Sequence, residues 1–325
     1  MPCFESSFAF VRGLIGQFRY SLGTRKLADS LQLAQQVYAT VQEQSNAALK
    51  VGGYRALALT LCMMGEFESA RRYARRGVRL WRSRSAPSPV EEADAPIVTC
   101  LLVEGLIKWH FGEGVAWQVD MDEAISVAKE QNDMHGLVMA LFFVAMLDHF
   151  ERRTTEVERL ATELMEVATR QHFAFWLAIG TALRGWARSA SDEAVEGLTW
   201  IEDGIRAIRA TSGMRGMAYW LAVKAEALHL AARTPEALET IQQAEALAES
   251  LDEGLWRAEP QRLRGVFLAS LGAEEAQVEA AFREAIATAQ QLKSVSLAER
   301  AEATYAEYRR QKASGSGGRA IRLPL

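Results

Sequence analysis

The sequence predicts an all-α fold in which helical hairpins repeat along the chain and stack into an α-solenoid. Its 325 residues are rich in Ala, Leu, Glu and Arg and include only 7 prolines, which favours helix. Helical, apolar-rich segments recur at intervals of about 40 residues, and each contains two amphipathic stretches joined by a short turn. These observations indicate about seven tetratricopeptide-like hairpins in a right-handed superhelix, in which each hairpin buries its apolar face against its neighbours.

The predicted hairpins form one domain over residues 1–312. They are expected to begin near Glu5, Asn46, Asp94, Asp133, Phe173, Met214 and Gly254. The interval between the second and third hairpins is longer than the others because it holds a Pro- and Ser-rich stretch, which predicts an inserted loop at 83–96. The Gly- and Ser-rich residues 313–325 lack apolar periodicity and are predicted to be a disordered tail.

The second hairpin shows the repeat pattern clearly. "YRALALTLCMM" has Ala and Leu at helical spacing, "GEF" supplies a turn, and "ESARRYARRGVRLW" places its apolar residues on one helical face. The three cysteines are widely spaced, which fits a reducing compartment better than a disulfide framework. We expect Cys62 to be a small buried residue of this hairpin.

The later hairpins contain a strongly apolar segment and residues that are typical of helix starts and helix ends. The run "LVMALFFVAML" at 137–147 is too short to cross a membrane, which takes ~20 residues, and predicts a helix buried on nearly all sides. Thr234 and Pro235 suit a helix start, and Gly272 suits a left-handed helix end. Pro260 predicts that a helix begins afresh or bends at Glu259–Gln261. A last helix over Ser296–Gln311 should close the stack.

Several stretches together resemble a known family. "LALTLCMMGEFESARRYARRGVRLW", "FAFWLAIGTALRGWARS" and "YWLAVKAEALHLAARTPEALETIQQAEALAE" are similar in order and spacing to the tetratricopeptide-type C-terminal tail of bacterial signalling ATPases. In that family a class III adenylate/guanylate cyclase domain and a P-loop ATPase module precede the tail. The resemblance covers residues from about Gly13 to Arg310 and implies a helical-repeat sensor or scaffold. Continuous helix at the position of Pro260 is usual in the family, so the hairpin that contains Pro260 departs from it.

The front modules of that family have no counterpart in this sequence. There is no G-x-x-x-x-G-K-[ST] phosphate loop, and no strand segment could hold the metal-binding aspartates of a cyclase. The five histidines, His110, His135, His149, His172 and His229, include no pair at metal-binding spacing. We expect His149 to bond backbone carbonyls at a helix end. The sequence therefore predicts no enzymatic activity, no cofactor and no metal site.

Aromatic residues are the best candidates for partner contacts. Most of the eight tryptophans are expected to pack in the core. Trp176, Tyr219 and Trp220, however, lie early in first helices, which line the concave face of a solenoid. Arg184, Arg215 and Lys224 are predicted to supply polar anchors on the same surface.

A basic stripe follows the second helix of the second hairpin. Its members are Arg71, Arg72, Arg75, Arg76, Arg79 and Arg82. Residues 1–90 hold 13 basic and 5 acidic residues, although the whole chain has a net charge of −4. At 100° per residue the stripe points away from the apolar face, so we interpret it mainly as a solvated outer surface. Opposite charge at the two ends could favour salt-sensitive self-association.

The sequence as a whole favours a non-enzymatic, cytoplasmic scaffold or sensor that binds a protein or peptide partner in bacterial signal transduction. The partner could be a separately encoded P-loop ATPase/cyclase module. A second interpretation is a small-molecule sensor, because relatives of this repeat type in transcription activators bind inducers within the superhelix. A third is a nucleic-acid-associated regulator that uses the basic N-terminal end. A contiguous exposed apolar groove would favour a peptide, and an enclosed pocket of roughly 300–1,000 Å³ would favour a small ligand.

Overall fold

A computed structural model describes residues 2–24, 26–43, 46–83, 96–191, 193–211, 216–314 and 323–325. Most of the predicted loop at 83–96 therefore lies outside the described residues. The described part of the chain holds fifteen α-helices and no strand. Their bounds are α1 (Pro2–Thr24), α2 (Leu27–Gln42), α3 (Ala47–Met63), α4 (Phe67–Arg82), α5 (Pro96–His110), α6 (Ala116–Glu130), α7 (Met134–Phe150), α8 (Thr154–Arg170), α9 (Ala174–Ala190), α10 (Ala194–Ala210), α11 (Met217–Leu230), α12 (Thr234–Ser250), α13 (Ala258–Ser270), α14 (Glu275–Gln291) and α15 (Val295–Ala313).

The helices form seven successive hairpins, from α1–α2 to α13–α14, and α15 packs on the last of them. First helices of neighbouring hairpins also contact each other, from α3 with α5 through α11 with α13. They therefore form the inner layer, and the second helices form the outer layer. This arrangement confirms the predicted all-α solenoid. Helix α7, which contains the apolar run at 137–147, is an inner helix and is buried along most of its length.

The turns between helices repeat one conformation. Gly272 ends α13 with a φ of +71°, as predicted, and Gly65 and Gly112 have the same left-handed backbone. At equivalent turns the position is filled by residues other than glycine, including Arg152, with a φ of 58°, and Ala232, with a φ of 59°. Each of these residues ends a helix and lets the chain reverse within two or three residues.

The helix boundaries predicted from the sequence lie within a few residues of those in the structure. Helix α12 begins at Thr234 with Pro235 in its first turn, so the N-cap is Arg233 rather than Thr234. Helix α13 begins at Ala258, which places Pro260 in its first turn and fits the predicted fresh start. Cys62 is fully buried, as expected, and burial raises the pKa of its thiol to about 12.

The predicted disordered tail differs from the structure at its last residues. Leu323 is buried and packs with Leu325 against the main core, and the Arg262 guanidinium donates to the carbonyl of Pro324 over 3.2 Å. The two leucines therefore have apolar partners in the core, and the Pro324 carbonyl has a polar partner in the buried Arg262. The end of the chain is therefore attached to the solenoid near α13.

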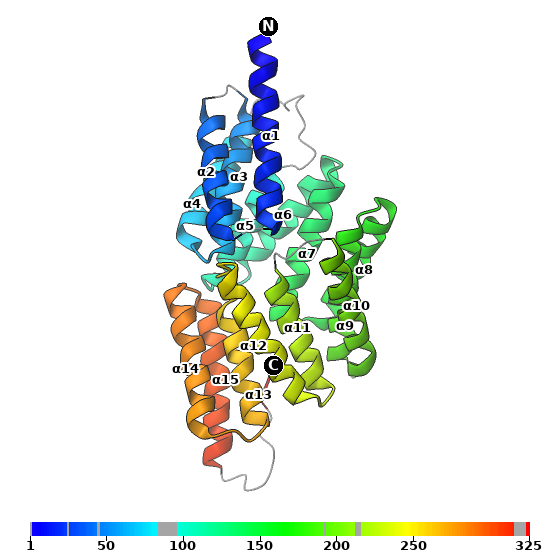
Figure 1. Ribbon diagram of the computed structural model, residues 1–325, viewed down its shortest axis with the longest axis vertical. Helices are drawn as coiled ribbons and strands as arrows, with labels where there is room; N and C mark the ends of the chain where they lie inside the picture. The colour runs from blue at the N-terminus through cyan, green and yellow to red at the C-terminus, as the bar shows by residue number, and fades with distance from the viewer. Residues whose placement is uncertain are drawn as a thin grey trace.

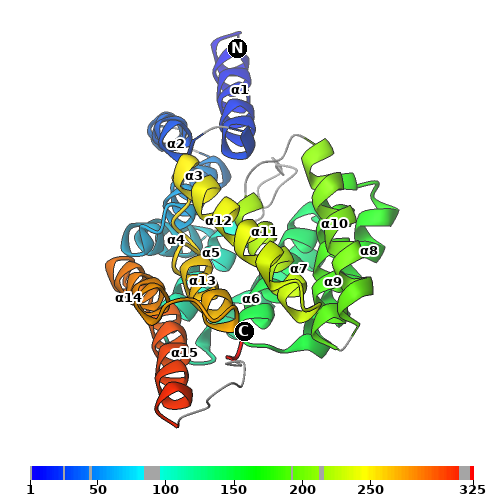
Figure 2. The same ribbon diagram turned by 60° about the horizontal axis from the view of Figure 1, so that its bottom comes forward.

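The superhelix closes on itself, so that its two ends meet. The amides of Gly254 and Leu255 donate to the carbonyl of Met63, over 2.9 and 3.1 Å. Helix α15 contacts α5, where His110 Nδ1 lies 2.7 Å from Ser294 Oγ. Figure 1 shows the result, with α13–α15 directly below α2–α5 in one column and α7–α10 forming the other side. Seen from below, the helices surround a common interior (Figure 2).

Most of the solenoid shares one continuous apolar core. It runs from α3 to α15 and includes the large buried side chains Trp186, Trp220, Phe267 and Phe282. A smaller cluster joins α1, α2 and α3 around Phe18. Among the described residues, no helix has both the length and the apolar character needed to span a bilayer.

Candidate ligand-binding cavity

A cavity of about 360 Å³ lies inside the closed superhelix. Inner helices α7, α9 and α11 form one wall. The opposite wall comes from the ends of α1, α3 and α12 and from the segment that leads into α13. The cavity thus exists only where the two ends of the solenoid meet. Because it is bounded by elements far apart in sequence, no single hairpin could form it.

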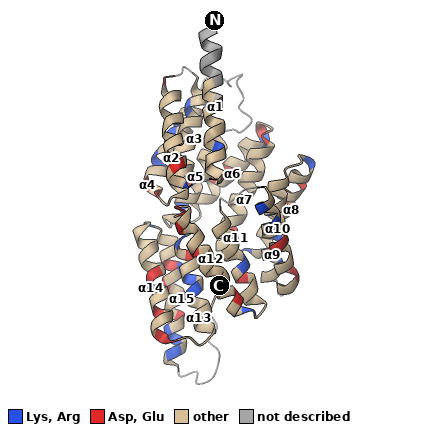
Figure 3. Ribbon diagram, viewed as in Figure 1, with Lys and Arg blue, Asp and Glu red and all other residues tan. Residues whose placement is uncertain are grey.

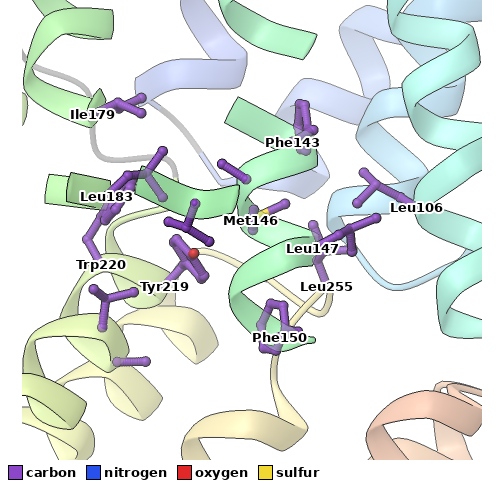
Figure 4. Close-up of a cluster of buried hydrophobic side chains, with 14 of the residues drawn as sticks. Leu106, Phe143, Met146, Leu147, Phe150, Ile179, Leu183, Tyr219, Trp220 and Leu255 are labelled. Carbon is purple, nitrogen blue, oxygen red and sulfur yellow. The ribbon is translucent and has the colours of Figure 1, made fainter. Parts of the chain in front are cut away.

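The cavity wall is mainly aromatic and thioether in character. Figure 4 shows this part of the interior, where Met146 of α7 lies beside Tyr219 of α11, with Trp220 on one side and Phe143 on the other. Phe142 lies between two tryptophan rings, 6.0 Å from Trp176 and 6.0 Å from Trp220. The apolar lining residues are Leu22, Leu59, Met63, Met139, Phe142, Phe143, Met146, Phe150, Phe175, Trp176, Ile179, Ala218, Tyr219, Trp220, Ala222, Ala248, Leu255, Trp256 and Pro260. Flexible thioethers beside rigid rings can accommodate apolar groups of varied shape.

The carboxylate of Glu226 forms a buried polar cluster at the cavity wall. It accepts hydrogen bonds from Arg152 over 2.6 Å and from the Trp186 indole over 3.1 Å. Burial alone would raise the pKa of Glu226, but the charge of Arg152 and the contact with His149 outweigh it and hold this pKa well below its usual value. Arg152 occupies a left-handed turn position, which lets its side chain reach across to α11.

The bonding of His149 differs from the sequence prediction. Instead of backbone carbonyls, its Nδ1 lies 2.9 Å from the Tyr219 hydroxyl and its Nε2 lies 3.3 Å from Glu226 Oε1. Burial lowers the pKa of His149, so the ring is neutral and has one N–H. An ionised Glu226 can only accept, so Nε2 donates to it and Nδ1 accepts from Tyr219. The sequence prediction was wrong because α11 brings side-chain partners to the end of α7.

A second buried carboxylate, Glu259, joins the C-terminal helices to the cavity wall. It accepts from Arg262 over 2.9 and 2.7 Å and from Arg300 over 3.1 and 3.2 Å. Arg300 also donates to the carbonyl of Phe150 over 3.0 Å, which ties α15 to the end of α7. Burial would raise the pKa of Glu259, but Arg262 and Arg300 lower it to about 2. Both carboxylates are therefore ionised and already bonded.

The segment between α12 and α13 completes the cavity. It places Leu255 and Trp256 in the wall, and the Trp256 ring stacks on Phe150 at 4.4 Å. Gly254 passes so close to the α3–α4 turn that a Cβ atom would lie 2.1 Å from the carbonyl oxygen of Met64. Because the fresh helix start at Ala258 leaves these residues outside helix, they can bridge the two ends of the solenoid.

Three aromatic residues singled out in the sequence lie together at this cavity. Trp176 lies in the first turn of α9, Tyr219 and Trp220 lie in the first turn of α11, and all three line the wall. Their exposed fractions are 9%, 5% and 2%, so most of each ring is packed and one face borders the space. Sequence reasoning missed the α7 residues, because an uninterrupted apolar run has no periodicity to distinguish the side that lines a cavity.

Arg184 and Lys224, two of the three predicted polar anchors, do not lie at the cavity with these aromatic residues. The guanidinium of Arg184 lies over the Trp200 ring at 4.9 Å, and Lys224 Nζ lies 2.8 Å from Glu202. Both side chains therefore face α10 in the outer layer, and neither lines the cavity. The structure thus does not bring these two side chains together with the aromatic residues, because their positions on the helical wheel turn them toward the second helices. Their role in binding a partner stays a prediction. Arg215 lies outside the described residues.

The basic stripe of α4 is partly engaged within the molecule. Arg71 pairs with Glu104 and Glu113 at 3.1 and 2.6 Å, Arg75 pairs with Glu104 at 2.9 Å, and Arg82 pairs with Glu123. Arg72, Arg76 and Arg79 are exposed. Figure 3 shows acidic residues beside basic ones in this region. The stripe therefore combines a solvated surface with ion pairs that join α4 to the third hairpin.

The described residues contain no group of three or more His, Cys, Asp or Glu side chains placed to hold a metal ion. The buried carboxylates Glu226 and Glu259 at the cavity wall are bonded to neighbouring side chains rather than arranged around a nucleophile. The arrangement is therefore one that can bind an apolar group.

Comparisons of the sequence with known proteins give limited matches. A family model described as anaphase-promoting complex subunit 5 matches residues 96–151 and 264–311, which together make up less than half of the chain. No curated protein matches the sequence.

Several solved structures are similar to this chain to different degrees. The structure of a Rap protein complexed with competence and sporulation factor is similar, with a TM-score of 0.58 and 11% identity, over 94% of this chain and 87% of that chain. BtubC from P. vanneervenii has a TM-score of 0.47 and 12% identity over 74% of this chain and 92% of that chain. A tetratricopeptide repeat protein from Parabacteroides merdae has a TM-score of 0.43 and 13% identity, over 88% and 98%. Together with its fifteen described helices, the likeness to the Rap protein gives this chain the fold of a tetratricopeptide-like helical-repeat protein.

Proposed function

We propose that the protein is a non-enzymatic binding protein that takes a hydrophobic segment of a peptide or partner protein into the central cavity. The observation that carries this proposal is the apolar cavity of about 360 Å³ enclosed by both ends of the solenoid. Ligand pockets are typically concave, mainly apolar and supplied with a few polar groups. Side chains from α7, α9 and α11 are already packed in place around it, so little ordering is needed on binding.

A small organic molecule is the second candidate ligand. The cavity volume falls at the lower end of the ~300–1,000 Å³ range of small-molecule sites. The same volume would hold only one or two large side chains of a peptide. A peptide would therefore insert a short apolar anchor and leave the rest of its length outside the cavity.

A cavity-blocking variant tests the proposed function. Met139 is half-buried in the cavity wall, so Met139→Trp should fill the space. We expect wild type to bind the neutral apolar dye N-phenyl-1-naphthylamine, measured by fluorescence titration, and the variant to bind it at least tenfold more weakly. Val195→Trp on α10 adds the same ring at a residue 76% exposed and should leave binding unchanged. Equal binding by all three proteins would contradict the proposal.

Competition distinguishes the two candidate ligands. Short hydrophobic peptides that displace the dye from wild type but not from Met139→Trp would support the peptide. Displacement by small organic molecules alone would support the second candidate.

The resemblance to the tails of signalling ATPases supports a cytoplasmic signalling context and a separately encoded P-loop ATPase/cyclase module as partner. Co-purification of such a module with wild type, and its loss with Met139→Trp, would support this partner. Nucleic-acid binding and salt-sensitive self-association remain predictions for the exposed arginines of α4. Size-exclusion chromatography at low and high salt tests the self-association, and an unchanged monomer at both would contradict it.

A further inference from the structure

The central cavity has acidic groups in its wall but no free acceptor among them. Glu226 is saturated by Arg152, Trp186 and His149, and Glu259 by Arg262 and Arg300. A third carboxylate, Glu253, accepts from the amide of Gly216 over 3.0 Å. A cationic ligand would have to compete with these internal donors, so the cavity disfavours positive charge.

A donor, in contrast, is available at the cavity. Arg257, directly after Trp256, lines it and is exposed. Within the part of the chain that the structure describes, its guanidinium makes no hydrogen bond or ion pair. Arg19 of α1 also lines the cavity and brings a second positive charge. An exposed guanidinium at the edge of an apolar space is suited to bind a carboxylate or a similar anion.

The backbone adds to this preference. Helices α9 and α11 both begin at the cavity wall, and neither has a side-chain N-cap. Their dipoles place partial positive charge on that side, although at α11 the Glu253 carboxylate already accepts from the Gly216 amide. At the end of α3 the carbonyl of Met63 is already occupied by the amides of Gly254 and Leu255.

We propose that the ligand of this cavity is an anionic amphiphile, whose apolar part enters among the aromatic rings and whose single negative group binds Arg257. The inference rests on the proposed binding function and names its ligand class. Two sources share this chemistry: a free organic acid with an apolar body, and the C-terminal carboxylate of a short hydrophobic peptide.

A pair of dyes of similar shape tests the charge. The anionic dye 8-anilinonaphthalene-1-sulfonate should bind wild type at least tenfold more tightly than neutral N-phenyl-1-naphthylamine, and raising the salt concentration should reduce that advantage. Arg257→Gln should remove most of the difference and leave the neutral dye unaffected, which also shows that the variant is folded. Arg206→Gln, which removes one exposed charge from α10, should change neither affinity.

The outcomes distinguish an error in the proposed ligand class from an error in the proposed binding function. Equal affinity for both dyes, or no effect of Arg257→Gln, would overturn the anionic ligand while leaving the cavity as a binding site. If neither dye binds, both this inference and the proposed function are wrong.

Competition with the anionic dye identifies the source. Displacement by dodecanoate favours a free acid. Displacement by N-acetyl-Leu-Phe-Leu, but not by its C-terminal amide, favours a peptide carboxylate. Displacement by neither acid, or equally by the peptide and its amide, would contradict the proposed ligand class.

Discussion

Two kinds of contact hold this solenoid together, and they differ in chemistry. Contacts between successive hairpins are mainly apolar, such as those of Trp186 and Phe282 in the continuous core. Contacts that close the ring combine aromatic packing of Trp256 with single polar bonds, as at Gly254 with Met63 and at His110 with Ser294. Stacking tolerates many apolar residues of suitable size, whereas closure depends on single donors, acceptors and one glycine.

This difference shows how a repeat protein can acquire a specific site. Stacking alone would give an open superhelix with a broad groove. Closure brings the ends of α1, α3 and α12 and the segment before α13 around the same space as α7, α9 and α11, and the cavity arises between them. Substitutions at the closing contacts should therefore affect the cavity more than equally conservative substitutions in the outer layer.

The largest expected effect comes from Glu259. Its replacement, Glu259→Ala, leaves Arg262 and Arg300 buried without their carboxylate, and the free energy of unfolding should fall by about 3–5 kcal/mol. Urea denaturation at pH 7 measures this change. The control is Glu68→Ala, which removes an exposed closing pair with Lys293 and should cost less than about 1 kcal/mol. Similar losses for the two variants would contradict the assigned role of the buried pair.

Gly254→Ala should have the next largest effect, because the new Cβ would overlap the carbonyl of Met64. We expect loss of the two hydrogen bonds to Met63, a cost of about 2–4 kcal/mol and a partly opened ring. Small-angle scattering should show a larger radius of gyration, and the emission of Trp256 should shift to the red. Gly13→Ala, at an open position of α1, serves as the control. An unchanged radius in Gly254→Ala would mean that the ends do not depend on this approach.

A smaller, pH-dependent effect is expected at His110. Burial lowers the pKa of this histidine to about 3, so it stays neutral in the folded protein and takes up a proton below about pH 6.5 when unfolded. Its contribution to stability is therefore complete above pH 6.5 and is lost as the pH falls toward 3, with about 2 kcal/mol lost by pH 5. His110→Gln can keep a hydrogen bond to Ser294 and does not titrate. Urea denaturation at pH 7.5 and pH 5 should show a smaller loss in this variant, and equal losses would refute the prediction.

Periodicity was enough to predict the hairpins but not their closure. Stacking leaves a signal in every repeat, because apolar residues recur at helical spacing. Closure leaves no such signal, since the contacts between Gly254 and Met63 or between His110 and Ser294 each occur once and join distant positions. Pro260 did indicate an interrupted helix, yet nothing local shows that the interruption reaches across to α3.

The candidate site was predicted in part for the same reason. Trp176, Tyr219 and Trp220 were found because they lie early in first helices, where the repeat exposes residues to the interior. Arg184 and Lys224 were misplaced because a few tens of degrees of helix rotation decide between the inner and outer layers. Phe142 and Met146 lie in an unbroken apolar run, and the sequence alone does not distinguish their two sides.

The contact between the two ends also changes how the chain should unfold. In an open array each repeat touches only its neighbours, so the ends can fray and stability adds up almost linearly along the chain. Here α15 contacts α5, and residues 254 and 255 contact residue 63, so neither end can be lost without also removing support from the other. Such long-range contacts favour a single cooperative transition and slower folding than local repeats would give. The ring thereby gives an elongated repeat array the all-or-none behaviour of a compact globule.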